Sequence, residues 1–207
     1  IGPLLWQKYH TELPDWFHDL RADVPVIWVY FGNPRYTNGG TALDSEIIIR
    51  ASVNILQDMD VQVILSTGHH KLPDEYLPLP SNFLFVPYVP GLAMAERCAL
   101  MVHHGGYGSC QTGLFTGTPA VIIPTLSERE SNARRLANIG AGEYILPQTK
   151  ANGEKAVSLD EFQAKAQQVL RNPSYKQNAR RAAEDIATYG GAIQAADLIE
   201  GVAKKAG

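Results

Sequence analysis

The residues most able to do chemistry form one glycine-rich turn, HHGGYGS at residues 103–109. An apolar run at 99–103 predicts a strand before the turn, and a helical pattern follows it to Thr116. Glycines at a strand end allow positive φ angles and close approach of backbone N–H groups to a ligand. A helix start adds unpaired N–H groups and a partial positive charge. The turn is therefore predicted to bind an anion, most naturally phosphate or diphosphate.

Other glycine and histidine motifs fit this turn poorly. A P-loop would end in GK[ST], and the dinucleotide fingerprint needs glycine where Gln111 stands. A nucleophile elbow needs glycine at Tyr107, and a Ser109–His104 pair has no acidic residue that can be placed to orient it. Adjacent histidines on a strand point to opposite faces, so the pairs 69–70 and 103–104 do not predict a metal site. Ser109 can either cap the helix or donate to a phosphate.

Alternating strands and helices must position this turn. Continuous apolar strands between helices predict a parallel sheet covered on both faces. From Ser158 onward the pattern is helical, with a capping box to Glu161 and a break at Asn172-Pro173. We predict a Rossmann-like three-layer α/β/α domain with a mostly parallel sheet of about six strands and C-terminal helices. The predicted strands are 24–31, 61–67, 83–89, 99–103, 120–124 and 143–147, and the predicted helices between them include 43–59, 92–98 and 132–139.

Composition narrows the class of protein. The chain has 207 residues, a net charge of −3, 45% hydrophobic and 19% charged residues, which is typical of a globular domain and indicates no nucleic-acid partner. Cys98 and Cys110 are too few for a disulfide scaffold, so we expect buried, reduced thiols and a cytoplasmic location. No apolar run reaches transmembrane length. The chain starts with isoleucine, and we expect it to be part of a longer protein.

Residues 86–142 resemble the signature region of the UDP-glycosyltransferase-like family, which has the GT-B fold. The stretch begins VPYVPG and contains HHGGYGSCQTG, and its doubled histidine is similar to the bacterial branch, which glycosylates antibiotics, sterols and other natural products. Residues 2–4 and 13–16 resemble the linker into the family's C-terminal half, and residues 190–200 resemble its closing helix. The resemblance implies an interdomain linker at 1–23 and a nucleotide-sugar-binding domain at 24–207, one half of a GT-B fold.

The resemblance also implies donor-binding roles by position. His104 would contact the donor diphosphate, and Tyr88 stands where the family often stacks a tryptophan on the base. Without the resemblance, Tyr88 is equally well explained as an aromatic of the core. Val89 would offer its backbone to the base edge. The full implied set is Gly32, Asn33, Tyr88, Val89, His104, Gly106, Gly108, Ser109, Thr112, Glu128 and Arg129.

The sequence departs from the family pattern in three places, one of them a pair of residues. Thr112 stands where a glutamate often binds the ribose, and Gly91 replaces a usual glutamine. Glu128 and Arg129 replace the Asp-Gln pair that grips the sugar. Glu128 can still accept from sugar hydroxyls, and the planar fork of Arg129 could meet a carboxylate or phosphate. The alternative for Arg129 is a helix-start residue paired with Glu130 or with solvent.

The resemblance implies the donor half of an inverting glycosyltransferase. It would use a UDP-sugar or dTDP-sugar, a small-molecule or lipid acceptor, and neither metal nor cofactor. The catalytic base would lie in a missing N-terminal acceptor domain, so this chain alone is expected to be inactive, with His104 stabilising the leaving diphosphate. Two alternatives remain open: an epimerase of the UDP-GlcNAc 2-epimerase type, which residues 127–129 resemble, and a non-enzymatic nucleotide-binding domain.

Overall fold

The computed structural model describes residues 1–4, 13–30, 41–68 and 71–206 of the chain, except for the side chains of residues 41–45 and 206. Its main sheet has six strands in the order β3-β2-β1-β4-β5-β6, and all neighbouring pairs are parallel. The sheet therefore runs outward in both directions from β1 and β4, as in doubly wound folds. The strands are β1 (Val26–Tyr30), β2 (Gln62–Ser66), β3 (Phe83–Phe85), β4 (Leu100–His103), β5 (Ala120–Ile122) and β6 (Gly142–Tyr144).

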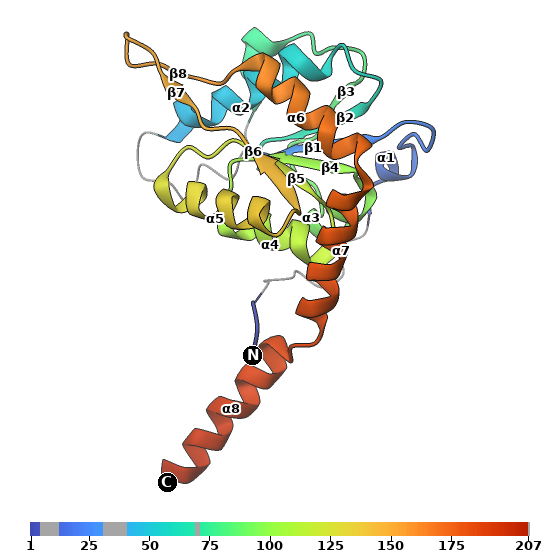
Figure 1. Cartoon of the computed structure of the whole chain (residues 1–207). Helices are drawn as coiled ribbons and strands as arrows, with labels where there is room; N and C mark the ends of the chain where they lie inside the picture. The colour runs from blue at the N-terminus through green and yellow to red at the C-terminus, as the bar shows by residue number, and fades with distance from the viewer. Residues whose placement is uncertain (5–12, 31–40, 69–70, 207) are drawn as a thin grey trace.

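Helices cover both faces of this sheet (Figure 1). One face carries α2 (Thr41–Leu56) and α6 (Leu159–Arg171), and the other carries α3 (Gly91–Arg97), α4 (Tyr107–Thr116) and α5 (Ser127–Asn138). The side chains of β1 alternate between the two layers, because Ile27 and Val29 pack in the core below α2 and α6, and Val26 and Trp28 pack in the other. The three-layer Rossmann-like fold is thus confirmed.

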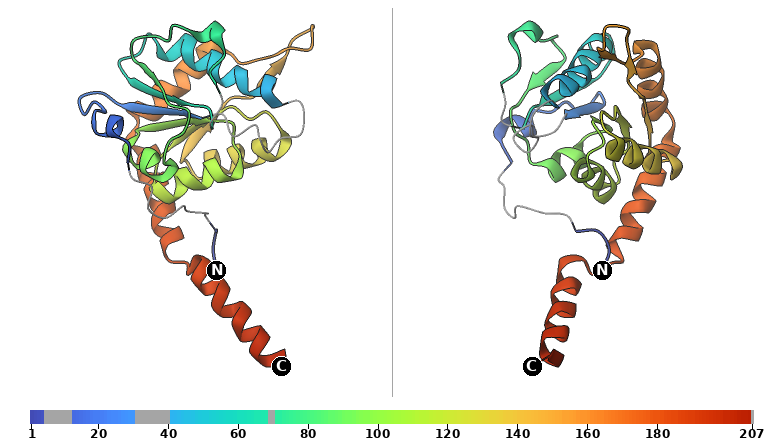
Figure 2. Two further views of the ribbon diagram at one scale, coloured as in Figure 1. Left: turned by 180° about the vertical axis from the view of Figure 1, so that it is seen from behind. Right: turned by 90° about the vertical axis from the view of Figure 1, so that its left-hand side faces the viewer.

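The C-terminal helices begin at the capping box and at the helix break that the sequence predicts. The Ser158 hydroxyl accepts a hydrogen bond from the Glu161 N–H at 3.2 Å and caps α6. The Asn172 side chain caps α7 (Pro173–Ala187), with Pro173 in its first turn. The last helix, α8 (Gly191–Ala206), points away from the body of the molecule (Figure 2). Its first N–H donates to the Ile1 carbonyl at 2.9 Å, so the N-terminal residue lies beside the start of this helix, and the C-terminal end of the helix lies away from it.

Several boundaries differ from the sequence prediction. The predicted strand 83–89 ends at Phe85, because β3 is an edge strand and Pro87 has no N–H to continue the ladder. Helix α5 starts five residues before the predicted 132, at Ser127. Three short elements were not predicted: α1 (Asp15–His18), the 3-10 turn η2 (Asp74–Tyr76) and the hairpin of β7 (Gln148–Thr149) with β8 (Lys155–Ala156).

The segment before β1 is partly built into the domain. Leu20 is buried in the layer of α3 and α4, and Trp16 and Phe17 of α1 pack against the same core. The division of the chain at residue 23 stays a prediction. No helix in the described part of the chain is long and apolar enough to cross a membrane.

Candidate functional site

The predicted anion site lies where the strand order reverses. β1 ends at Tyr30 and β4 ends at His103, and these two strands are neighbours that lead to opposite halves of the sheet. Ligands of open α/β sheets bind in the crevice beyond the carboxyl ends of such strands. Two predicted site residues, Gly32 and Asn33, lie outside the described residues.

The turn after β4 presents a row of backbone donors. Helix α4 begins at Tyr107 with Gly106 as its N-cap, and the first intrahelical bond runs from the Cys110 N–H to the Gly106 carbonyl at 3.1 Å. The N–H groups of residues 106–109 therefore have no intrahelical acceptor. Ser109 is the third residue of the helix and does not cap it. This geometry suits an anion at the helix N-terminus.

Each glycine of this turn is there for a different structural reason. Gly105 has φ +84°, and an added Cβ would lie 2.7 Å from the Arg129 carbonyl oxygen. A Cβ on Gly106 would lie 2.7 Å from His104 Nε2, so this glycine leaves space for the imidazole. A Cβ on Gly108 would meet no atom within 4 Å. Packing therefore explains Gly105 and Gly106, and Gly108 leaves open space at the start of the helix.

His104 is a buried, neutral imidazole. Burial lowers its pKa to about 3, with further lowering from the charges of Arg129 and His103. Its ring meets the ring of Tyr30 edge-on, with centroids 6.4 Å apart. Its Nδ1 is buried and has no hydrogen-bond partner among the described residues. The neutral ring carries one N–H that can donate a hydrogen bond, and any positive charge at the site must come from other groups.

The His103 side chain fixes the glycine turn through a hydrogen bond to its backbone. Its Nδ1 accepts from the Gly105 N–H at 3.1 Å, which requires the proton of the neutral ring to sit on Nε2. The side chain is fully buried, and burial lowers its pKa to about 3. The doubled histidine thus divides into one residue that fixes the turn and one that faces the candidate site.

Tyr30 is a site residue that the sequence reasoning missed. The Trp28 indole donates to the Ser66 hydroxyl at 2.8 Å and stacks on Tyr30 at a centroid distance of 5.6 Å. Tyr30 in turn contacts His104, and burial together with nearby Tyr88 raises the pKa of its hydroxyl. This ladder fixes the imidazole from the sheet side. The position of Tyr30 as the last residue of a central strand was the available signal.

The loop after β3 supplies the candidate base site. The side chain of Tyr88 is 45% exposed, so the explanation of this tyrosine as a core aromatic is wrong. Val89 is buried in the same core cluster as Trp28 and Met94 and anchors the loop to the domain. On α4, the Thr112 hydroxyl donates to the Gly108 carbonyl at 2.9 Å and keeps its lone pairs for another donor.

The first turn of α5 packs against the glycine turn. Arg129 is buried, and its Nη1 donates to the Thr125 hydroxyl at 2.5 Å. The solvent-facing part of the alternative explanation of Arg129 is wrong, since its side chain is buried, and Glu130 pairs with Arg134 at 2.7 Å.

Glu128 belongs to the same turn. It is exposed, and its Oε1 accepts from the Asn132 amide at 2.5 Å; that amide also donates to the Gly105 carbonyl at 3.0 Å. The structure therefore brings His104, residues 106–109 and residues 128–129 to one edge of the sheet.

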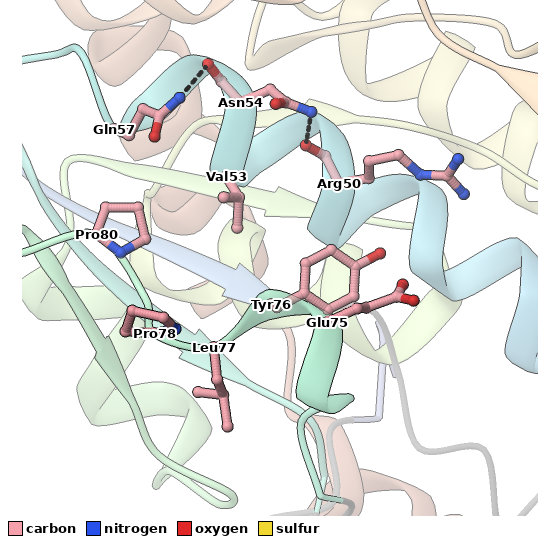
Figure 3. A pocket seen from close by; sticks show the side chains of 9 residues that line it. All are labelled: Arg50, Val53, Asn54, Gln57, Glu75, Tyr76, Leu77, Pro78 and Pro80. Carbon is pink, nitrogen blue, oxygen red and sulfur yellow. Dashed lines mark hydrogen bonds between the residues drawn. The ribbon is translucent and has the colours of Figure 1, made fainter.

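A separate cavity opens elsewhere on the surface. It has a volume of about 340 Å³ and lies between α2 and the segment around η2 (Figure 3). None of the predicted site residues that the structure describes lines it. Its walls are Arg50, Val53, Asn54, Gln57, Glu75, Tyr76, Leu77, Pro78 and Pro80. Within the described ranges, no cluster of three or more histidine, cysteine or acidic side chains could hold a metal ion.

Comparison with known proteins places this geometry in a family. Residues 50–197 match the family model "Erythromycin biosynthesis protein CIII-like, C-terminal domain". The chain is 34% identical over 185 residues to an uncharacterized UDP-glucosyltransferase, YojK, of Bacillus subtilis, which covers 88% of the chain and 44% of the relative. It is 29% identical over 189 residues to 4'-demethylrebeccamycin synthase of Lentzea aerocolonigenes, with 91% and 41% covered. The chain thus spans less than half the length of these relatives.

Solved structures agree on the fold. The glycosyltransferase of kitacinnamycin superposes with a TM-score of 0.72 at 25% identity, covering 97% of this chain and 48% of that one. Glycosyltransferase VinC, solved in complex with dTDP, superposes with a TM-score of 0.73 at 23% identity over 95% and 45% of the two chains. The fold is that of one half of a GT-B glycosyltransferase. Because the family model matches more than half of its length, the chain belongs to the family of erythromycin biosynthesis protein CIII-like C-terminal domains.

Proposed function

We propose that this chain is the donor-binding half of an inverting glycosyltransferase that takes its sugar from UDP or dTDP. The single observation that carries the proposal is the donor row of residues 106–109 beside the neutral His104, at the reversal point of the sheet. Family membership favours this reaction over the epimerase alternative. YojK is described as a UDP-glucosyltransferase and the VinC structure holds dTDP, so the donor carries either nucleotide.

The described residues divide the donor among three regions. The N–H groups of residues 106–109 and the His104 imidazole hold the diphosphate, where negative charge grows as the sugar leaves. The exposed ring of Tyr88 stacks on the base, a contact worth about 1–3 kcal/mol, and the Val89 backbone meets the base edge. Thr112 lies one turn along α4, in reach of the ribose. Gly32 and Asn33 remain predicted contacts on the sugar–phosphate side.

Glu128 and Arg129 complete the pocket on the sugar side. Both belong to the first turn of a helix that follows a neighbouring strand, so they border the same crevice as the diphosphate turn. Glu128 accepts from sugar hydroxyls, and Arg129 presents a fixed guanidinium to a polar or anionic group of the donor. The donor needs no metal ion in this scheme, because N–H groups and side chains meet its charge.

The acceptor and its base belong to the N-terminal half of a longer protein. Helix α8 offers that half a binding surface, since Leu198, Ile199 and Val202 lie on one side of it and are 58%, 70% and 69% exposed. The acceptor is a small molecule or a lipid. A cytoplasmic location fits the two free cysteines, Cys98 and Cys110, whose burial raises the pKa of both thiols to about 12.

A nucleotide screen tests the proposal. The 207-residue chain is titrated with UDP, dTDP, UMP and dTMP, and the diphosphates should bind with dissociation constants from about 10 μM to 1 mM, roughly −4 to −7 kcal/mol. The monophosphates should bind more weakly, because they lack the second group that faces the helix start. His104→Ala should weaken the diphosphates and leave the fold intact. Equal binding of all four nucleotides by both variants would reject the assigned site.

A further inference from the structure

The hairpin of β7 and β8 is tied to the molecule on two sides. On one side, the Glu154 carboxylate accepts from Arg50 of α2 at 2.9 Å and from Lys150 at 3.2 Å. On the other side, the Lys155 ammonium donates to the backbone carbonyl of Thr125 at 3.2 Å. Figure 1 shows the hairpin on the side of the molecule where α5 begins, and the left-hand view of Figure 2 agrees.

Thr125 receives two cationic side chains. Lys155 binds its backbone carbonyl, and Arg129 binds its hydroxyl at 2.5 Å. Thr125 is 7% exposed and lies in the short loop between β5 and α5. One contact therefore fixes the backbone of the loop, and the other fixes the guanidinium of Arg129 relative to that backbone. Lys155 comes from 30 residues further along the chain, so the contact is tertiary.

The position of Arg129 is transmitted to the site in two ways. Its backbone carbonyl packs against Gly105, where a Cβ would approach within 2.7 Å. Its charge is close enough to His104 to disfavour an imidazolium there. A displacement of Thr125 would therefore move Arg129, which the proposed function places on the sugar side of the pocket.

We propose that Lys155 is a positioning residue of the donor-sugar site: it holds Thr125, and Thr125 holds Arg129. The hairpin then contributes to the binding site indirectly, through Thr125 and Arg129. This inference rests on the proposed function, since it assigns Lys155 an effect on how the sugar of a nucleotide sugar is held.

The hairpin provides its own control. Lys150 carries the same charge on the same hairpin, is 52% exposed, and bonds to Glu154 instead of Thr125. Lys150→Met and Lys155→Met remove the same charge and leave the same stem. A difference between these variants therefore cannot come from net charge or from loss of a lysine in the hairpin.

The experiment compares nucleotides with and without a sugar. NMR titrations of the chain give dissociation constants for UDP and UDP-glucose, and for dTDP and dTDP-glucose, and the ratio within each pair reports the sugar contribution. Lys155→Met should weaken the sugar nucleotide relative to its diphosphate by about three- to tenfold, the usual effect of one hydrogen bond. Lys150→Met should leave the ratio unchanged. In an Arg129→Gln background, Lys155→Met should have little further effect, because the two act in series.

Two results would overturn the inference while the proposed function stands. One is an unchanged ratio for Lys155→Met in a chain that binds UDP or dTDP normally and melts like wild type. The other is an effect of Lys155→Met that persists in full in the Arg129→Gln background. If the wild-type chain binds neither diphosphate nor nucleotide sugar, the proposed function and the inference fail together.

Discussion

At the scale of single residues, the site is built around a histidine that stays neutral. Burial and the charge of Arg129 both oppose protonation of His104, and its pKa falls to about 3. An imidazole with an unperturbed pKa would change charge across neutral pH. This one donates a hydrogen bond at any physiological pH, while helix N–H groups supply the fixed positive potential.

This neutrality predicts a flat pH dependence. The affinity for UDP-glucose should not change between about pH 5 and pH 8, because His104 titrates far below that range. If the pKa of His104 had its ordinary value, the imidazole would lose its positive charge as the pH rises through that value. The affinity for the anionic donor would then fall. Titrations at several pH values check this. A fall centred near about pH 6.5 that disappears in His104→Gln would contradict it.

A substitution at Gly108 can distinguish the effect on stability from the effect on ligand affinity. An added Cβ meets no atom within 4 Å, and the position is helical. Gly108→Ala should therefore stabilise the unliganded chain by about 0.5–1 kcal/mol. It should also weaken UDP by about tenfold, because the methyl group enters the space of the diphosphate. Melting curves and calorimetry measure the two effects.

Gly201→Ala is the matched control for this change. Its Cβ is also unobstructed, and α8 lies outside the site, so UDP affinity should stay as in wild type. If Gly108→Ala leaves UDP affinity equally unchanged, the diphosphate does not lie at the start of α4.

At the scale of elements, we propose that the first turn of α5 determines how the donor sugar is held. Glu128 reaches the glycine turn through Asn132, and Arg129 is fixed by Thr125. An arginine in the first turn opposes the helix dipole, so its burial there indicates a specific partner in the site. The identity of the sugar is accordingly predicted to depend on this turn.

Restoring the family pair tests that dependence. Glu128→Asp combined with Arg129→Gln, made in the complete protein, should change the ranking of donors over a panel of UDP- and dTDP-sugars. Loss of one hydrogen bond to a sugar hydroxyl changes the relative activation free energies of two donors by about 0.5–1.5 kcal/mol. An identical ranking in both proteins would place the turn outside the sugar pocket.

Elements with local signals could be predicted from the sequence, and those that depend on tertiary contacts could not. The six strands are continuous apolar runs, and the glycines of residues 105–108 mark the turn. The strands and the turn could therefore be predicted from the sequence. The hairpin at 148–156 has no apolar period and is held by Arg50 and Thr125, which no local pattern reveals. The burial of Arg129 depends on the same threonine. Tyr30 acquires its role only through the strand order that sets it beside His104.

At the scale of the whole molecule, α8 stands apart from the α/β body of the chain (Figure 2). None of its described residues is buried, and Ala195, Leu198, Ile199 and Val202 follow the spacing of an amphipathic face. Removing the residues after Gly190 should therefore leave the chain folded, with UDP affinity unchanged. Circular dichroism and calorimetry check this, and an unfolded or non-binding truncation would show that α8 supports the domain directly.

The most direct test of the central claim is an NMR titration of the isotope-labelled chain with UDP and dTDP. The backbone amides of residues 106–109 should show the largest shifts, because their N–H groups point at the diphosphate, and Tyr88 should follow as the base stacks. The amides around the α2 cavity, such as Asn54 and Gln57, should stay in place. Shifts centred on that cavity, or none at ligand concentrations of about 10 mM, would contradict the assignment of this chain as a nucleotide-sugar donor domain.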